Sequence, residues 1–184
     1  MRTKFGRLAA ATLFTPGQRE LVIGSLLGDG SLLATTAGYC FRAHHGIAQH
    51  ALVDWKYAAL RNFVRTEPRR SGKAYYFRTV THPWLGQLRA MTYNAAGRKT
   101  VPLELLHESF GPLGLAAWLM DDGSADHACA SLRRFLHAKF DLEFTVNRDK
   151  GLPRLRCRAR SMRRLLELVG PHVIPEMRYK LPTP

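Results

Sequence analysis

The sequence predicts an α+β domain made of two related halves, of which the second is shorter. Two apolar segments, residues 22–30 (VIGSLLGDG) and 115–123 (LAAWLMDDG), both end in Asp-Gly and form an internal repeat. Apolar runs of this length that end in glycine are typical of helices whose final glycine adopts the left-handed conformation. We therefore expect one such helix in each half.

Small residues in these segments predict how the two helices meet. Gly24 and Ala117 occupy the same place in the two copies, and Gly28 lies one turn after Gly24. Small side chains let helix backbones approach closely. We expect the two helices to pack together and to bring Asp29 and Asp122 side by side at one end.

The chain between the two motifs predicts the remaining elements of the first half. Residues 31–45 have the spacing of a β-hairpin with Gly38 at its turn, and Leu52, Trp55, Ala59 and Phe63 would share one face of the following helix. The expected order after the hairpin is a helix over 52–64, a basic turn over 68–73, a strand over 75–80, a helix over 84–93 and a linker over 99–102.

The second half repeats this order with a piece missing. Only residues 124–131 separate its motif from the next expected helix, 132–140, whereas about twenty residues fill this interval in the first half. Two strands and a turn need roughly a dozen residues, so the first hairpin of this half is lost or shortened. We expect strands over 143–146 and 155–159 around a turn at 147–153, followed by a helix over 162–169.

Length, charge and cysteine content narrow the class of protein. A chain of 184 residues suits one domain, and its net charge of +14 favours an anionic partner, for which nucleic acid is the best candidate. The longest apolar runs, such as 8–14 and 112–120, are far shorter than the ~20 residues needed to span a membrane. The three cysteines form no CxxC pair, and His44, His45 and His50 have no fourth ligand at a spacing typical of zinc.

The N-terminal segment, residues 1–20, is basic and has no acidic residue before Glu20. Two interpretations fit it: a targeting peptide for an organelle, either mitochondrion or chloroplast, or a basic arm that lies on nucleic acid. We place the globular domain at residues 21–184, with half-repeats at 21–112 and 113–184.

Three stretches carry a resemblance to a known family. They are 81–124 (THPWLGQLRAMTYNAAGRKTVPLELLHESFGPLGLAAWLMDDGS), 44–56 (HHGIAQHALVDWK) and 174–181 (IPEMRYKL). Together with the repeated motif, they resemble the two-motif, single-chain branch of the LAGLIDADG homing endonucleases. The resemblance implies an αββαββα unit present twice, acting as a monomer with internal pseudo-dimer symmetry whose sheets form a saddle on the DNA major groove.

The resemblance also implies an active site at the motif ends. Asp29 and Asp122 would bind Mg²⁺, which prefers a few carboxylates together with waters and phosphate oxygens, and helix C-termini favour cations. The carbonyls of Gly28 and Asp121 are possible helpers, whereas the Asp121 carboxylate is not an expected ligand. The other implied catalytic candidates are His45 or Gln49, with His44 behind them, and Lys180.

Basic residues of the expected strands and turns are the candidate nucleic-acid contacts. Strand alternation over 155–159 would put Arg156 and Arg158 on one face of the sheet. Such contacts to phosphates position a protein without reading the base sequence. The full set of candidates is Arg42, Lys73, Arg78, Arg154, Arg156 and Arg158.

Two functions from different classes fit these features. The first is a site-specific, Mg²⁺-dependent endonuclease acting on double-stranded DNA, which both aspartates support. The second is a relative that binds structured RNA without cleaving it, either an intron maturase or a component of a ribonucleoprotein such as an organellar ribosome. The shortened second half supports the second function.

Overall fold

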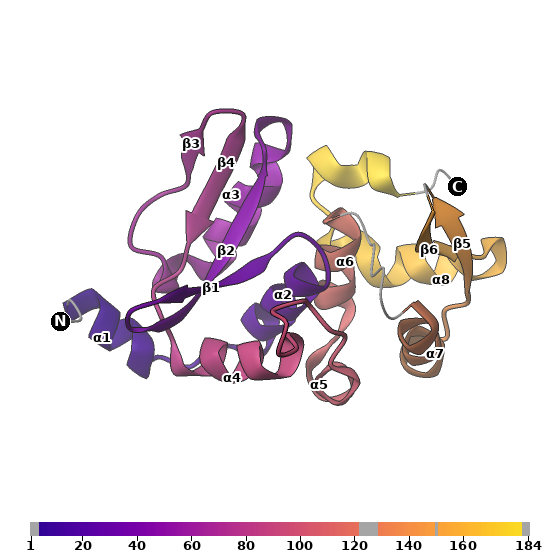
Figure 1. The fold of residues 1–184 in the computed structure, drawn as a ribbon. Helices are drawn as coiled ribbons and strands as arrows, with labels where there is room; N and C mark the ends of the chain where they lie inside the picture. The colour runs from indigo at the N-terminus through magenta and orange to yellow at the C-terminus, as the bar shows by residue number, and fades with distance from the viewer. Residues whose placement is uncertain (1–3, 122–128, 150, 182–184) are drawn as a thin grey trace.

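The computed structural model describes residues 4–121, 129–149 and 151–181, and it has one half on each side of a central helix pair (Figure 1). The helices of these residues are α1 (Lys4–Ala11), α2 (Pro16–Leu27), α3 (His50–Leu60), α4 (Pro83–Thr92), α5 (Leu103–Ser109), α6 (Pro112–Met120), α7 (Cys129–Phe140) and α8 (Ala159–Val169). The strands are β1 (Ser31–Thr35), β2 (Gly38–Gly46), β3 (Arg69–Ser71), β4 (Ala74–Arg78), β5 (Phe144–Asp149) and β6 (Leu152–Cys157).

Helices α2 and α6 contain the two repeated motifs and pack against each other, as the repeat predicts. The contact is backbone to backbone: a Cβ added at Gly24 would lie 2.1 Å from the carbonyl oxygen of Gly114. The closest partner of Gly24 is therefore Gly114 and not its repeat counterpart Ala117. Residues 21–27 of α2 are buried, as are all but Leu119 of residues 114–120 in α6, because each helix packs against the other half as well as its own.

The expectation of a left-handed glycine after the first motif is wrong for Gly30. Helix α2 ends at Leu27, and among the described residues the glycines with positive φ are Gly38, Gly72, Gly97 and Gly151. Gly30 is needed for another reason, since a Cβ there would lie 2.8 Å from the carbonyl oxygen of Ser25 and 2.9 Å from the Phe41 ring. The chain turns directly from α2 into β1, and this turn leaves no space for a side chain.

The first half contains a four-stranded antiparallel sheet in the order β1-β2-β4-β3. The predicted hairpin is confirmed, with Gly38 at φ +122° in its turn. The expected basic turn contains strand β3 as well as the turn at Gly72. Phe41 and Phe77 point to the face of the sheet that α3 and α4 cover. The residues that alternate with them along β2 and β4 point to the opposite face.

The buried face of α3 differs from the one predicted. It consists of Leu52, Val53, Lys56 and Leu60, while Ala59 is exposed. Burying a lysine costs free energy unless its charge is compensated. A prediction from the spacing of apolar residues therefore leaves lysine off the buried face of a helix. Lys56 is buried here because it meets a carboxylate from the second half.

The second half has a single hairpin among its described residues, formed by β5 and β6 and packed on α7. Only residues 122–128 separate Asp121 from α7, far fewer than the sixteen residues of the β1–β2 hairpin. The shortened second half is therefore confirmed. Helix α5 follows the predicted linker over 99–102 and packs against α7.

The N-terminal segment is structured where it is described. Phe14 stacks on Phe63 with ring centroids 3.8 Å apart, and the His82 ring is 3.0 Å from the Thr12 carbonyl oxygen. Helix α2 begins at Pro16, after a capping box between Thr15 and Gln18, and so runs across the boundary placed at residue 20. No helix within the described ranges has the length and hydropathy that crossing a membrane requires.

Candidate active site and nucleic-acid interface

The end of α2 carries Asp29, whose side chain is 53% exposed. His45, from the end of β2, lies behind it, with Nδ1 3.7 Å from an Asp29 carboxylate oxygen. The other ring nitrogen of His45 is 3.4 Å from Asp121 Oδ1, at the end of α6. The imidazole therefore lies between the carboxylates of the two motif ends. The expected partner of Asp29, Asp122, lies outside the described residues.

A buried ion pair joins the two halves directly behind this site. Lys56 Nζ donates a hydrogen bond to Asp121 Oδ1 at 2.5 Å, and both side chains are fully buried. Burial raises the pKa of the Asp121 carboxyl, and the Lys56 ammonium opposes this effect. Asp121 is thus paired with Lys56, and the expectation that its carboxylate is not a metal ligand stays a prediction.

His45 is held in its neutral form. Burial, together with the nearby Lys56 ammonium, lowers the pKa of the imidazole to about 4, and Asp29 opposes the shift. Lys56 Nζ is 3.3 Å from His45 Nε2, so a neutral ring with its proton on Nδ1 suits both neighbours. Gln49, in the short helix after β2, also hydrogen-bonds the His45 side chain, which brings these two predicted residues together.

Two lysines bind the backbone at the motif ends, one for each motif. Lys99, between α4 and α5, donates to the Gly28 carbonyl oxygen at 2.5 Å, and Lys180, in the last helical turn, donates to the Met120 carbonyl oxygen at 2.6 Å. Burial lowers the pKa of the Lys99 ammonium, and the Asp29 carboxylate opposes this shift. The Gly28 carbonyl that was expected to help bind a cation therefore faces an ammonium group.

Lys180 was predicted as a site residue, but Lys99 was not. The signal for Lys99 was present in the sequence, since it lies in the KTVP segment that carries part of the family resemblance. In the described residues three lysines (Lys56, Lys99 and Lys180) surround two carboxylates, those of Asp29 and Asp121.

The open face of the first-half sheet is basic and continues from the motif ends. Arg42 and Arg78 are directly opposite each other on β2 and β4, an arrangement of like charges that destabilises a sheet. Neither forms an ion pair with any carboxylate of the described residues, and Arg42 Nε is buried there without a hydrogen-bond partner. A phosphate-bearing ligand would relieve both unfavourable features.

Other polar side chains complete this face. His44 lies opposite Tyr76, and the Arg69 guanidinium stacks over the Tyr76 ring at 5.3 Å. A small hollow of about 270 Å³ is bounded by Leu33, Arg42, His44, Ser71, Tyr76 and Arg78. Lys73, another predicted contact, is exposed at the β3–β4 turn. His44 therefore belongs to the open face and not to the buried site behind Asp29.

In the second half the expected strand contacts are shifted by two residues. Strand β6 ends at Cys157, so Arg154 and Arg156 share one face of the strand. Arg158 lies beyond the strand and is the N-cap residue of α8. Arg158 lies 3.8 Å from the Glu143 carboxylate, an acid that Arg160 also binds. The prediction that Arg156 and Arg158 share a strand face is wrong because the helix begins earlier than residue 162.

The described residues fit a magnesium site only in part. They contain no group of three or more His, Cys, Asp or Glu side chains placed to hold a metal ion. Asp29 does offer an exposed carboxylate at a helix end, which is the hard oxygen ligand that Mg²⁺ prefers alongside water and phosphate. One protein carboxylate completed by phosphate and a second aspartate would be sufficient.

Comparison with known proteins gives a family match and several relatives. The model of the LAGLIDADG DNA endonuclease family matches residues 19–165. "Protein RecA" of Mycolicibacterium fallax is 28% identical and covers 92% of this chain but only 47% of its own length. The chain spans about half or less of the RecA relatives that it matches first.

Other similar proteins have names or titles that mention mRNA or DNA. "Cytochrome b mRNA maturase bI2" of Debaryomyces hansenii is 23% identical over 88% of this chain and 72% of its own. Among solved structures, the homing endonuclease I-WcaI bound to its DNA recognition sequence has a TM-score of 0.81 at 18% identity and covers all of this chain and 94% of its own. An I-DmoI variant with its target DNA and manganese has a TM-score of 0.52 at 15% identity, covering 88% of this chain and 98% of its own.

Proposed function

Because the chain belongs to the LAGLIDADG DNA endonuclease family, we propose that it is a site-specific endonuclease of the homing type that cleaves double-stranded DNA with Mg²⁺. One observation carries the proposal: the exposed Asp29 carboxylate lies among lysines from both halves, next to a sheet face whose Arg42 and Arg78 form no ion pair with a carboxylate of the described residues. The face supplies contacts to the duplex, and the motif ends meet a phosphodiester.

Each group at the motif ends has a distinct task in this mechanism. Asp29 and Asp122 hold Mg²⁺, which when bound activates water and neutralises charge on the attacking and leaving oxygens. Lys99 and Lys180 stabilise the negative charge that develops on the phosphate. His45 is neutral and holds its position between Asp29 and the buried Asp121, so it keeps the exposed carboxylate oriented toward the substrate.

Relatives support the use of DNA and a divalent ion. The solved I-WcaI structure contains its DNA recognition sequence, and the I-DmoI structure contains target DNA in the presence of manganese. Both share the fold of this chain at low identity, so the substrate and metal are inferences for this chain.

The test is cleavage of a randomised duplex library in Mg²⁺, with sequencing of the new DNA ends. We expect one family of related sites for the wild-type protein and none for Asp29→Asn or Asp122→Asn. Asp141→Asn is a matched control because Asp141 is exposed, and its φ of +56° is easily adopted by asparagine. Equal cleavage by Asp29→Asn and the control variant would exclude the proposed metal site.

The second candidate is binding of structured RNA without cleavage. It is favoured by the single hairpin in the described part of the second half, which leaves less sheet to pair with a half-site, and by the similarity to a protein named an mRNA maturase. On this hypothesis Asp29→Asn would leave intron splicing or ribonucleoprotein assembly unchanged. A strict requirement for Asp29 in either process would count against it.

A further inference from the structure

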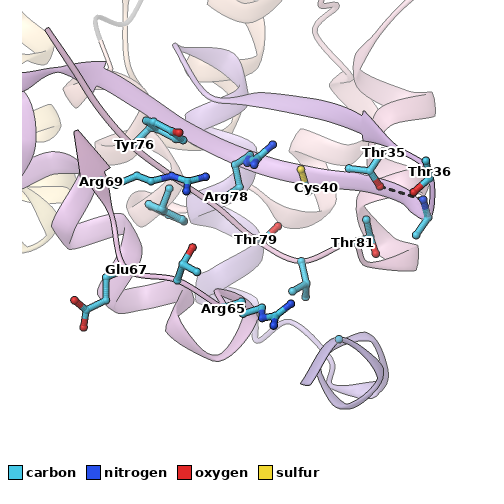
Figure 2. A pocket seen from close by; sticks show the side chains of 15 residues that line it. Thr35, Thr36, Cys40, Arg65, Glu67, Arg69, Tyr76, Arg78, Thr79 and Thr81 are labelled. Carbon is cyan, nitrogen blue, oxygen red and sulfur yellow. Dashed lines mark hydrogen bonds between the residues drawn. The ribbon is translucent and has the colours of Figure 1, made fainter. Parts of the chain in front are cut away.

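A second hollow lies at the outer end of the first-half sheet, beside helix α1 (Figure 2). Its volume is about 840 Å³, roughly three times that of the hollow on the sheet face. Residues of strands β2, β3 and β4 line it, together with α1 at Gly6, the β1–β2 turn, the loop between α3 and β3, and the chain that follows β4. We call it the α1 groove.

Positive charge and hydroxyl groups dominate the lining of the α1 groove. Figure 2 shows Arg65, Arg69 and Arg78 approaching it from different segments, with Glu67 at its edge. None of these arginines forms an ion pair with a carboxylate elsewhere in the described residues. The threonines of the lining are Thr35, Thr36, Thr66, Thr79 and Thr81. Arginines and hydroxyls of this kind are the usual ligands of a sugar-phosphate backbone.

The α1 wall is held in place by the residues that follow it. Phe14 stacks on Phe63, meets His82 edge-on at a centroid distance of 4.9 Å, and lies tilted against Trp84 at 4.7 Å. The His82 ring also lies 3.0 Å from the Thr12 carbonyl oxygen, which fixes the residue just after α1. A wall tied to the core in this way loses less conformational entropy on binding than a free tail would.

Helix α1 also adds charge beyond the family pattern. It carries Lys4 and Arg7, both exposed and three residues apart, so they share one side of the helix. The family match begins at residue 19, after α1. The helix therefore lies outside the part of the chain that the family model matches, whereas the rest of the groove's lining, residues 35–81, lies inside it.

The α1 groove is continuous with the basic face of the sheet. Tyr76 and Arg78 line both the α1 groove and the hollow on the sheet face, so the two meet at these residues. The Arg69 guanidinium lies over the Tyr76 ring at the same place. A nucleic-acid strand that follows the sheet face would therefore enter the groove without leaving positively charged surface. The second half also has a basic hollow, which Arg133 and Arg134 help to line, but at about 400 Å³ it is about half as large. Its other arginines, Arg158 and Arg160, already pair with the Glu143 carboxylate.

We propose that the α1 groove binds the phosphate backbone of the DNA duplex that flanks the recognition site on the side of the first half. The inference rests on the proposed function, because it takes duplex DNA as the partner. It makes the complex asymmetric, with a longer contact on the first-half side than on the second-half side.

The test compares Arg65→Ala with Arg163→Ala on the duplex recovered by library cleavage. Both variants lose one positive charge, but Arg163 is 93% exposed on α8 and pairs only locally with Glu167. Affinity is measured over a range of salt concentrations, on the full duplex and on one shortened at the first-half flank. We expect Arg65→Ala to weaken binding to the full duplex roughly threefold to tenfold and to reduce the salt slope by about 0.9.

On the shortened duplex the difference between the two variants should disappear, because the phosphates that Arg65 contacts are gone. Hydroxyl-radical footprints of the wild-type protein should also extend further on the first-half side. An equal loss for Arg65→Ala on both duplexes, or a symmetric footprint, would overturn the groove while leaving the proposed function intact. A wild-type protein that binds no duplex at all would overturn both.

Discussion

The close backbone contact between α2 and α6 makes Gly24 a sensitive position of the fold. In the variant Gly24→Ala the new Cβ would lie 2.1 Å from the Gly114 carbonyl oxygen and 2.9 Å from its carbonyl carbon. Both atoms belong to the backbone of α6, so no rotamer change can relieve the clash. The helices must separate, and they would do so along their most buried faces.

The expected cost follows from this geometry. Overpacking a core typically costs about 1–3 kcal/mol, and a backbone-against-backbone clash belongs at or above the upper end of that range. A matched substitution, Gly86→Ala, should have the opposite sign. Gly86 lies inside α4, where a Cβ would meet nothing closer than the Tyr39 ring at 4.0 Å. Replacing a helical glycine there should stabilise the protein by about 0.5–1 kcal/mol.

Urea unfolding followed by tryptophan fluorescence measures both variants. Trp118, on α6 and 1% exposed, reports on the interface itself. We expect Gly24→Ala to lower the free energy of unfolding by about 3 kcal/mol or more, which for a domain of this size corresponds to a fall in Tm of roughly 6–12 °C. A cost below about 1 kcal/mol for Gly24→Ala, or an equal cost for Gly86→Ala, would refute the backbone contact between the halves.

Three further predictions concern charged groups. Lys56→Met should lower the free energy of unfolding by about 3–5 kcal/mol because it leaves the Asp121 carboxylate buried without its cation. Adding Asp121→Leu should recover most of the loss. Additive costs of the two substitutions in urea unfolding would contradict the ion pair. The pKa of the His45 imidazole in the folded protein, about 4, lies below its ordinary value of 6.5. Burial of the neutral ring therefore makes its full contribution to the free energy of unfolding above pH 6.5, and this contribution is lost as the pH falls toward 4. Between pH 7.5 and 5, the wild-type protein should lose about 2 kcal/mol of unfolding free energy that His45→Gln does not lose. Identical pH profiles for the two proteins would show that the ring is not buried in its neutral form. Arg78→Thr should stabilise the free protein by a few tenths of a kcal/mol, since it removes the like charge opposite Arg42, and should weaken DNA binding; a loss of stability would mean that the two arginines do not repel each other.

The fold was predictable because the repeat is visible in the residues that pack. Apolar runs with small residues at matching places indicate two helices that meet closely, and these helices do pack together. The β1–β2 hairpin was equally clear from its spacing and from Gly38. The loss or shortening of the first hairpin in the second half followed from counting residues, because the eight residues 124–131 cannot form two strands and a turn of ordinary length.

What sequence reasoning missed depended on contacts between distant segments. Lysine is almost never fully buried, so nothing local marks Lys56 as the partner of Asp121, 65 residues away. The position of Arg158 depended on a helix boundary, which periodicity places only within a few residues. Lys99 was visible as part of a motif, but its role appears only when its ammonium is seen on the Gly28 carbonyl.

The central claim is that the basic sheet face and the motif ends act on DNA. Crosslinking the protein in its native source, purifying it under denaturing conditions and sequencing both the attached DNA and the attached RNA tests this claim most directly. The account predicts enrichment of one discrete DNA locus, with crosslinked peptides from β2 and β4, where Arg42 and Tyr76 lie on the open face. Enrichment of ribosomal or intron RNA instead would contradict it and would mean that the same face holds RNA.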